Sequence, residues 1–68
     1  MPVIIFEGGK MDPAKKKELI GKLTQVSAEV TGIDPQSFIV YIHENDLDAI
    51  GVGGSVLAEI LAARDQGS

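Results

Sequence analysis

The sequence predicts a small α/β domain in which one helix connects two parallel strands. Three observations predict this fold. Residues 3–6 and 37–43 form two apolar segments rich in β-branched and aromatic residues, which favour strands. The segment between them carries apolar residues at helical spacing, together with start and stop signals of a helix. A helix of this length between two strands is typical of a right-handed crossover, which makes the strands parallel.

Length and composition indicate one domain, residues 1–68, with a limited core. A chain of 68 residues buries only about 60% of the surface that its unfolded form exposes. The chain has no cysteine and one histidine, so neither a disulfide framework nor a structural zinc site is expected. Association with further copies is the remaining means of stabilisation for so small a domain.

The charge distribution argues against two classes of partner. Ten acidic and six basic residues give a net charge of -4, which repels nucleic-acid phosphates and anionic lipid. The sequence has no apolar run of about 18 residues, and its first residues lack the basic and apolar regions of a signal peptide. We therefore expect a cytoplasmic protein that binds neither nucleic acid nor membrane.

The first strand is expected over residues 3–6, which are apolar without alternation, as in a strand covered on both faces. Residues 7–10, Glu-Gly-Gly-Lys, follow as a turn or loop. Pro2 precedes the strand, where the missing backbone donor costs least. Removal of Met1 would leave Pro2 with a free secondary amine.

The helix is expected to begin at Asp12-Pro13, an N-cap aspartate followed by proline in the first helical position. It should end at Thr31-Gly32, where glycine can adopt the left-handed conformation of a C-terminal turn. The three lysines at 15–17 are expected on its solvated side. Its apolar stripe consists of Leu19, Ile20, Leu23, Val26 and Val30.

Both faces of the predicted sheet are apolar. Strand one places Val3 and Ile5 on one face and Ile4 and Phe6 on the other, and strand two is apolar on both sides as well. One amphipathic helix covers only one face, so the other requires a second copy of the chain. The pattern predicts an obligate homo-oligomer that assembles through paired sheets.

Residues 51–54, Gly-Val-Gly-Gly, predict a tight hairpin arm. A phosphate-binding loop is the alternative, but no Gly-Lys-Ser/Thr follows. Residues 55–64 are expected to form a short helix capped by Ser55, and residues 65–68 to fray. Glu44, Asp46 and Asp48 are expected to be surface charge, because the loop lacks the glycine and distal glutamate of a calcium-binding loop.

One set of residues recurs through these predicted elements: Pro2-Val3-Ile4, Lys16, Leu19-Ile20, Ser37, Glu44 and Gly51-Val52-Gly53-Gly54. With this set the chain resembles the tautomerase superfamily, in particular the small enzymes of the 4-oxalocrotonate tautomerase type. The resemblance covers nearly the whole chain. It implies a β-α-β protomer assembled as a hexamer, a trimer of dimers with four-stranded sheets. It also implies a cofactor-independent tautomerase or isomerase that acts on a small unsaturated 2-hydroxy or 2-oxo acid, with Pro2 as general base.

The implied chemistry requires a neutral amine at Pro2. Burial among Val3, Ile39, Ile50 and Val52 would disfavour the protonated amine, and a nearby lysine would act in the same direction. Lys10 is the candidate lysine. Its charge could bind the substrate carboxylate and stabilise the dienolate that forms when the proton is removed.

Three positions depart from the best-known members of the family. Lys10, in a shortened loop, and Ile39 stand where those members have arginines, and Ile50 stands where they have phenylalanine. Lysine does not provide the bidentate carboxylate contact of arginine, and isoleucine provides no charge. Tyr41 and His43 share a strand face with Ile39 and either donate hydrogen bonds to substrate or fill a sheet interface.

The candidate site therefore has Pro2 as the catalytic residue, a substrate pocket and no metal. Two alternatives stay open: an oligomeric scaffold or small-acid binding protein without catalysis, and an enzyme that adds water or another nucleophile to an activated alkene. The pocket candidates are Lys10, Ile39, Tyr41, Ile50 and Val52.

Overall fold

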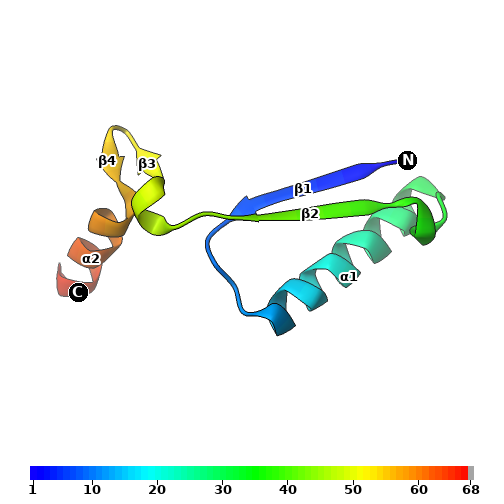
Figure 1. Ribbon diagram of the computed structural model, residues 1–68, viewed down its shortest axis with the longest axis horizontal. Helices are drawn as coiled ribbons and strands as arrows, with labels where there is room; N and C mark the ends of the chain where they lie inside the picture. The colour runs from blue at the N-terminus through cyan, green and yellow to red at the C-terminus, as the bar shows by residue number, and fades with distance from the viewer. Residues whose placement is uncertain (68) are drawn as a thin grey trace.

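The computed structural model, which describes residues 1–67, has the predicted β-α-β order (Figure 1). Strand β1 (Val3–Gly8), helix α1 (Pro13–Thr31) and strand β2 (Ile39–Glu44) form the body. The arm consists of β3 (Gly51–Val52), β4 (Ser55–Val56) and helix α2 (Leu57–Gly67). Two single-turn 3₁₀ helices, η1 (Pro35–Ser37) and η2 (Leu47–Ala49), precede β2 and β3.

β1 and β2 pair in parallel over their full length, as predicted. The first strand is two residues longer than the sequence indicated, because Glu7 and Gly8 also pair with β2. The second strand begins later than predicted, since Asp34 caps η1 by accepting a hydrogen bond from the Gln36 N–H (2.9 Å), which places Ser37 in that turn. The register sets Val3 opposite Ile39, Ile5 opposite Tyr41, and Glu7 opposite His43.

Helix α1 has the predicted ends. The Asp12 carboxylate accepts a hydrogen bond from the Lys15 N–H (2.9 Å), and Pro13 occupies the first turn. At the other end Gly32 adopts the left-handed conformation (φ 74°), and its N–H donates to the Ala28 carbonyl (2.9 Å). Neither helix in residues 1–67 is long and apolar enough to cross a membrane.

The two faces of the sheet differ in exposure. Ile4 and Phe6 are half-buried, whereas Val3, Ile5 and Tyr41, on the opposite face, are 52%, 58% and 50% exposed. Among residues 1–64 no side chain is fully buried. Strand pairing and one helix therefore leave an apolar face open; we call the surface formed by Val3, Ile5 and Tyr41 the open face.

The chain is extended for its size. The structure measures 46 × 23 × 18 Å, because the arm projects beyond one end of the sheet (Figure 1). Its radius of gyration is 15.9 Å, whereas a compact chain of 68 residues has one of about 11 Å. The surface area of 5194 Å² exceeds that of a compact folded monomer of this mass by roughly 1,000 Å².

The glycine-rich segment forms the predicted hairpin. β3 and β4 are antiparallel, and the turn between them holds Gly53 and Gly54 at φ 61° and 87°. Positive φ at both turn positions matches the twist of paired strands and favours glycine. The prediction that Ser55 caps the last helix is wrong, because Ser55 pairs with Val52 in the hairpin. Helix α2 continues to Gly67, three residues beyond the predicted end of this helix, and Ser68 lies outside the described residues.

Polar contacts connect α1 to the end of β2. The Glu44 carboxylate accepts from the Met11 N–H and from Lys16 Nζ, both at 2.9 Å. Next to it, the Asn45 N–H donates to the Gly8 carbonyl (2.8 Å). The side chains of Lys16 and Glu44 are only 31% and 28% exposed. These contacts fix where the chain leaves the sheet toward the arm.

The N-cap of α1 gives a first test. Asp12→Ala removes the acceptor of the Lys15 N–H, so we expect it to lower the free energy of unfolding by about 1 kcal/mol. Urea denaturation at one fixed protomer concentration would measure the change. Glu29→Ala, an exposed acidic position on the same helix, is the control. Equal stability of the two variants would contradict the capping role.

Glu44 gives a second test, which depends on pH. The hydrogen bond from Lys16, followed by that from the Met11 N–H, lowers the pKa of Glu44 below its ordinary value of 4.5. Its contribution to stability is therefore fully present above pH 4.5 and lost as the pH falls through the lowered pKa of the folded state. We expect Glu44→Gln to lower the denaturation midpoint at pH 7, and the difference from the wild-type protein to shrink below pH 4.5. A difference that is constant between pH 7 and pH 3 would contradict this assignment; Glu29→Gln is the control.

Candidate active site

Pro2 lies at the start of the parallel sheet and is half-buried. Its carbonyl accepts a hydrogen bond from the Ile39 N–H (3.0 Å), which brings the start of β2 beside it. Met1, before it, is 88% exposed. The structure therefore confines the backbone of Pro2 while the residue that would have to be removed is accessible.

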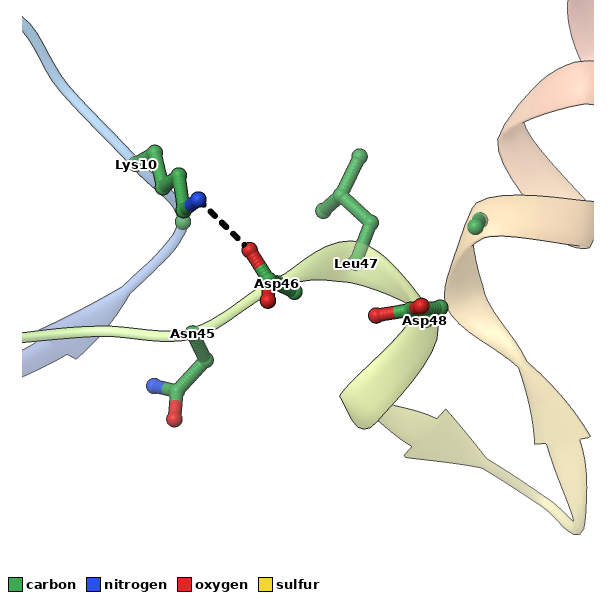
Figure 2. A pocket seen from close by; sticks show the side chains of 7 residues that line it. Lys10, Asn45, Asp46, Leu47 and Asp48 are labelled. Atoms are coloured by element: carbon green, nitrogen blue, oxygen red, sulfur yellow. Dashed lines mark ion pairs between the residues drawn. The ribbon is translucent and has the colours of Figure 1, made fainter.

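Lys10 lies at the opposite end of the sheet, in the loop after β1. It lines a pocket of about 560 Å³ between the end of the sheet and the arm, together with Gly9, residues 45–48 and Ala58 of α2. Figure 2 shows Lys10 and Asp46 pointing toward one another at this pocket, with Nζ 2.9 Å from Oδ1. The pocket combines one cation, two carboxylates and apolar groups.

Asp46 changes the electrostatics of Lys10. The hydrogen bond from Lys10 to Asp46, together with the attraction between their charges, raises the pKa of the lysine. Lys10 is therefore a cation at neutral pH, and its charge is already paired. A lysine that is cationic in this way is able to bind a carboxylate, provided that the carboxylate competes with Asp46.

Within one chain, Pro2 does not lie near Lys10, Ile50 or Val52, so the grouping predicted from the sequence stays a prediction that requires residues from more than one copy. β1 begins at Pro2 and ends before Lys10, so about 20 Å of strand separates them. β2 runs parallel to β1 and leads into the arm, which places Ile50 and Val52 at the far end as well (Figure 1). Only Ile39 among the predicted pocket residues lies beside Pro2 in the same protomer.

The other predicted pocket residues have distinct places. Tyr41 lies on the open face, where its ring centroid is 6.2 Å from that of His43. The Ile50 carbonyl accepts from the Leu57 N–H (2.8 Å), which connects the base of the hairpin to α2. Val52 is 56% exposed in β3. Among the described side chains, those of residues 1–64, no cluster of three acidic, histidine or cysteine residues is placed to hold a metal ion.

Sequence reasoning treated Asp46 as surface charge and missed its pairing with Lys10. A signal was present: Lys10 and Asp46 each follow a predicted strand by a short distance. Since parallel strands end at the same edge of a sheet, charges placed just after both strands meet there. The same argument would have predicted that Glu44 lies close to the start of the helix.

Comparisons with known proteins agree with this geometry. The family described as tautomerase enzyme matches residues 2–60. DmpI from Archaeoglobus fulgidus is 42% identical, with a TM-score of 0.78 over 84% of this chain and 98% of its own. The apo form of unFused 4-OT is 30% identical, with a TM-score of 0.77 over 82% of this chain and 98% of its own.

A homologue of 4-oxalocrotonate tautomerase is 25% identical, with a TM-score of 0.79 over 87% of this chain and 95% of its own. A search of curated proteins gives no match. The family match includes Pro2, both strands of the sheet and the hairpin arm. On the strength of this match, the chain belongs to the tautomerase family.

Proposed function

We propose that the protein is a cofactor-independent tautomerase that acts on a small unsaturated 2-hydroxy or 2-oxo acid in the cytoplasm, with Pro2 as general base after removal of Met1. The observation that carries this proposal is the family match from residue 2 onward, joined to the position of Pro2 beside Ile39 at the start of the paired strands.

The proton transfer follows from the chemistry of a secondary amine. The neutral Pro2 nitrogen accepts the proton of the 2-hydroxy group, and the electron pair left on oxygen forms a dienolate. The protonated amine then returns a proton to a carbon of the conjugated system, so that the oxygen becomes a carbonyl and the amine is neutral again. Lys10 contributes a positive charge that binds the acid and stabilises the dienolate.

This function requires more than one copy of the chain, because the distance along β1 separates Pro2 from Lys10 within a protomer. The extended shape supports such an assembly: the surface in excess of a compact monomer is comparable to the roughly 800 Å² per partner of a standard interface. The open face and the projecting arm are the surfaces that a second copy would cover. We propose a homo-oligomer, a hexamer built as a trimer of dimers.

A non-catalytic small-acid binding protein of the same fold is the second candidate. It is favoured by Ile39, which provides no charge beside Pro2, and by the pairing of Lys10 with Asp46. Intact-mass measurement separates the two candidates, because a retained Met1 would make the Pro2 nitrogen an amide without useful basicity.

The catalytic role of Pro2 is tested by Pro2→Ala in protein whose N-terminal processing has been verified by mass. We expect turnover of 2-hydroxypenta-2,4-dienoate, followed by its ultraviolet absorbance, to fall by a factor of about 10² to 10⁴. Pro13→Ala, at the start of α1, is the matched control. Sedimentation should show the same assembly for both variants. Wild-type turnover by Pro2→Ala would refute the role.

The assembly is tested on the open face. Ile5 is 58% exposed in one chain, and we expect Ile5→Lys to place a charge in the interface, so that sedimentation velocity shows smaller species or unfolded chain. Gln25→Lys, which adds the same charge on the exposed side of α1, should keep the wild-type sedimentation coefficient. An unchanged assembly of Ile5→Lys would exclude the open face as an interface.

A further inference from the structure

The ion pair between Lys10 and Asp46 lies at the edge of the pocket beside the arm (Figure 2). Lys10 Nζ is 2.9 Å from Asp46 Oδ1, and the two side chains are 73% and 61% exposed. A pair so exposed to water contributes little to stability, because solvent screens the attraction and both side chains lose freedom. Stability alone is therefore a weak reason for this arrangement.

The Asp46 carboxylate is also not used for capping. Asp12 and Asp34 precede helices and accept hydrogen bonds from backbone N–H groups in their first turns. Asp46 has the same position before η2, but within residues 1–67 its side chain makes no capping bond. Its carboxylate is instead directed at Lys10. A capping role, which asparagine fills as well as aspartate, therefore does not account for the carboxylate at this position.

The composition of the pocket defines what an incoming acid would meet. Lys10 is the cation, Asp46 and Asp48 are carboxylates, and Leu47 and Ala58 add apolar surface. The charges sum to one negative charge. A substrate carboxylate that approaches Lys10 would have to displace Asp46 and would be repelled by it at close range. A second carboxylate on the substrate would increase that repulsion.

We propose that Asp46 is a specificity-determining residue, whose carboxylate occupies the Lys10 ammonium and selects substrates that carry one carboxylate and an apolar remainder. This inference rests on the proposed function in one respect, the assignment of Lys10 as the group that binds the substrate acid. Asp46 acts through Lys10 and takes no part in the proton transfer itself.

Binding of unreactive analogues to the assembled full-length protein tests this proposal. The probes are hexa-2,4-dienoate, with one carboxylate; hexa-2,4-dienedioate, with two; and the neutral hexa-2,4-dienamide. Amide chemical-shift titrations give a dissociation constant for each. We expect Asp46→Asn to bind the monoanion about threefold to fivefold more tightly than wild type, as removal of an exposed competing pair allows. The gain should be larger for the dianion and absent for the amide.

Three control variants define the source of the change. Glu18→Gln removes a carboxylate of a similarly exposed ion pair, with Lys22, away from the pocket, and should leave all three affinities unchanged. Asp48→Asn removes a pocket carboxylate outside the ion pair and should give a smaller gain than Asp46→Asn. In a Lys10→Met background, Asp46→Asn should give a smaller gain for the monoanion than in the wild-type background, because the competition for Lys10 is absent and only the direct repulsion by Asp46 is removed.

The outcomes separate this inference from the proposed function. Equal monoanion affinity of wild type and Asp46→Asn, an equal gain for the neutral amide, or no saturable binding to either protein would overturn the role of Asp46. None of these binding measurements depends on turnover. If neither protein turns over 2-hydroxypenta-2,4-dienoate but the predicted affinity pattern is found, the proposed function fails and the Lys10 and Asp46 assignment stands.

Discussion

The parallel pairing of β1 and β2 is the constraint on which the rest of the structure depends. Because both strands run in the same direction, the residues just before each strand lie at one end of the sheet and the residues just after each strand lie at the other. Pro2 and Ile39 therefore lie side by side at the end of the sheet where both strands begin. The charged groups after the strands, and the arm with Ile50 and Val52, lie at the other end, where both strands finish; we call this the C-terminal edge of the sheet.

The same constraint links stability to function. Two strands and one helix leave the open face uncovered, and residues 1–64 include no fully buried side chain. A chain that is too extended to enclose a core gains from association, because each copy removes apolar surface from water. The proposed reaction requires association too, since the general base and the cation lie at opposite ends of one chain. Assembly would meet both needs with one set of surfaces.

The sequence predicted the order of the elements because each boundary has a local cause: Asp12 and Pro13 begin α1, Gly32 ends it, and Gly53-Gly54 form the hairpin turn. Periodicity also predicted the two sheet faces. Pairing across the chain was harder to predict. The additional strand residues depend on register with β2, and the contact of Lys10 with Asp46 joins residues 36 positions apart. A helix pattern also failed at Ser55, where cross-strand pairing decided the conformation.

The two carboxylates at the C-terminal edge of the sheet, Glu44 and Asp46, have different roles, because they differ in exposure and in hydrogen-bond partners. The Glu44 side chain is 28% exposed and accepts from a backbone N–H as well as from Lys16, so removing its charge would weaken both contacts near the start of α1. Asp46 is well exposed and has Lys10 as its ion-pair partner. An exposed carboxylate beside a cation costs little to displace, but it adds repulsion for every further negative charge that enters. A pocket with Asp46 in place discriminates by substrate charge, even where it adds little to the stability of the fold.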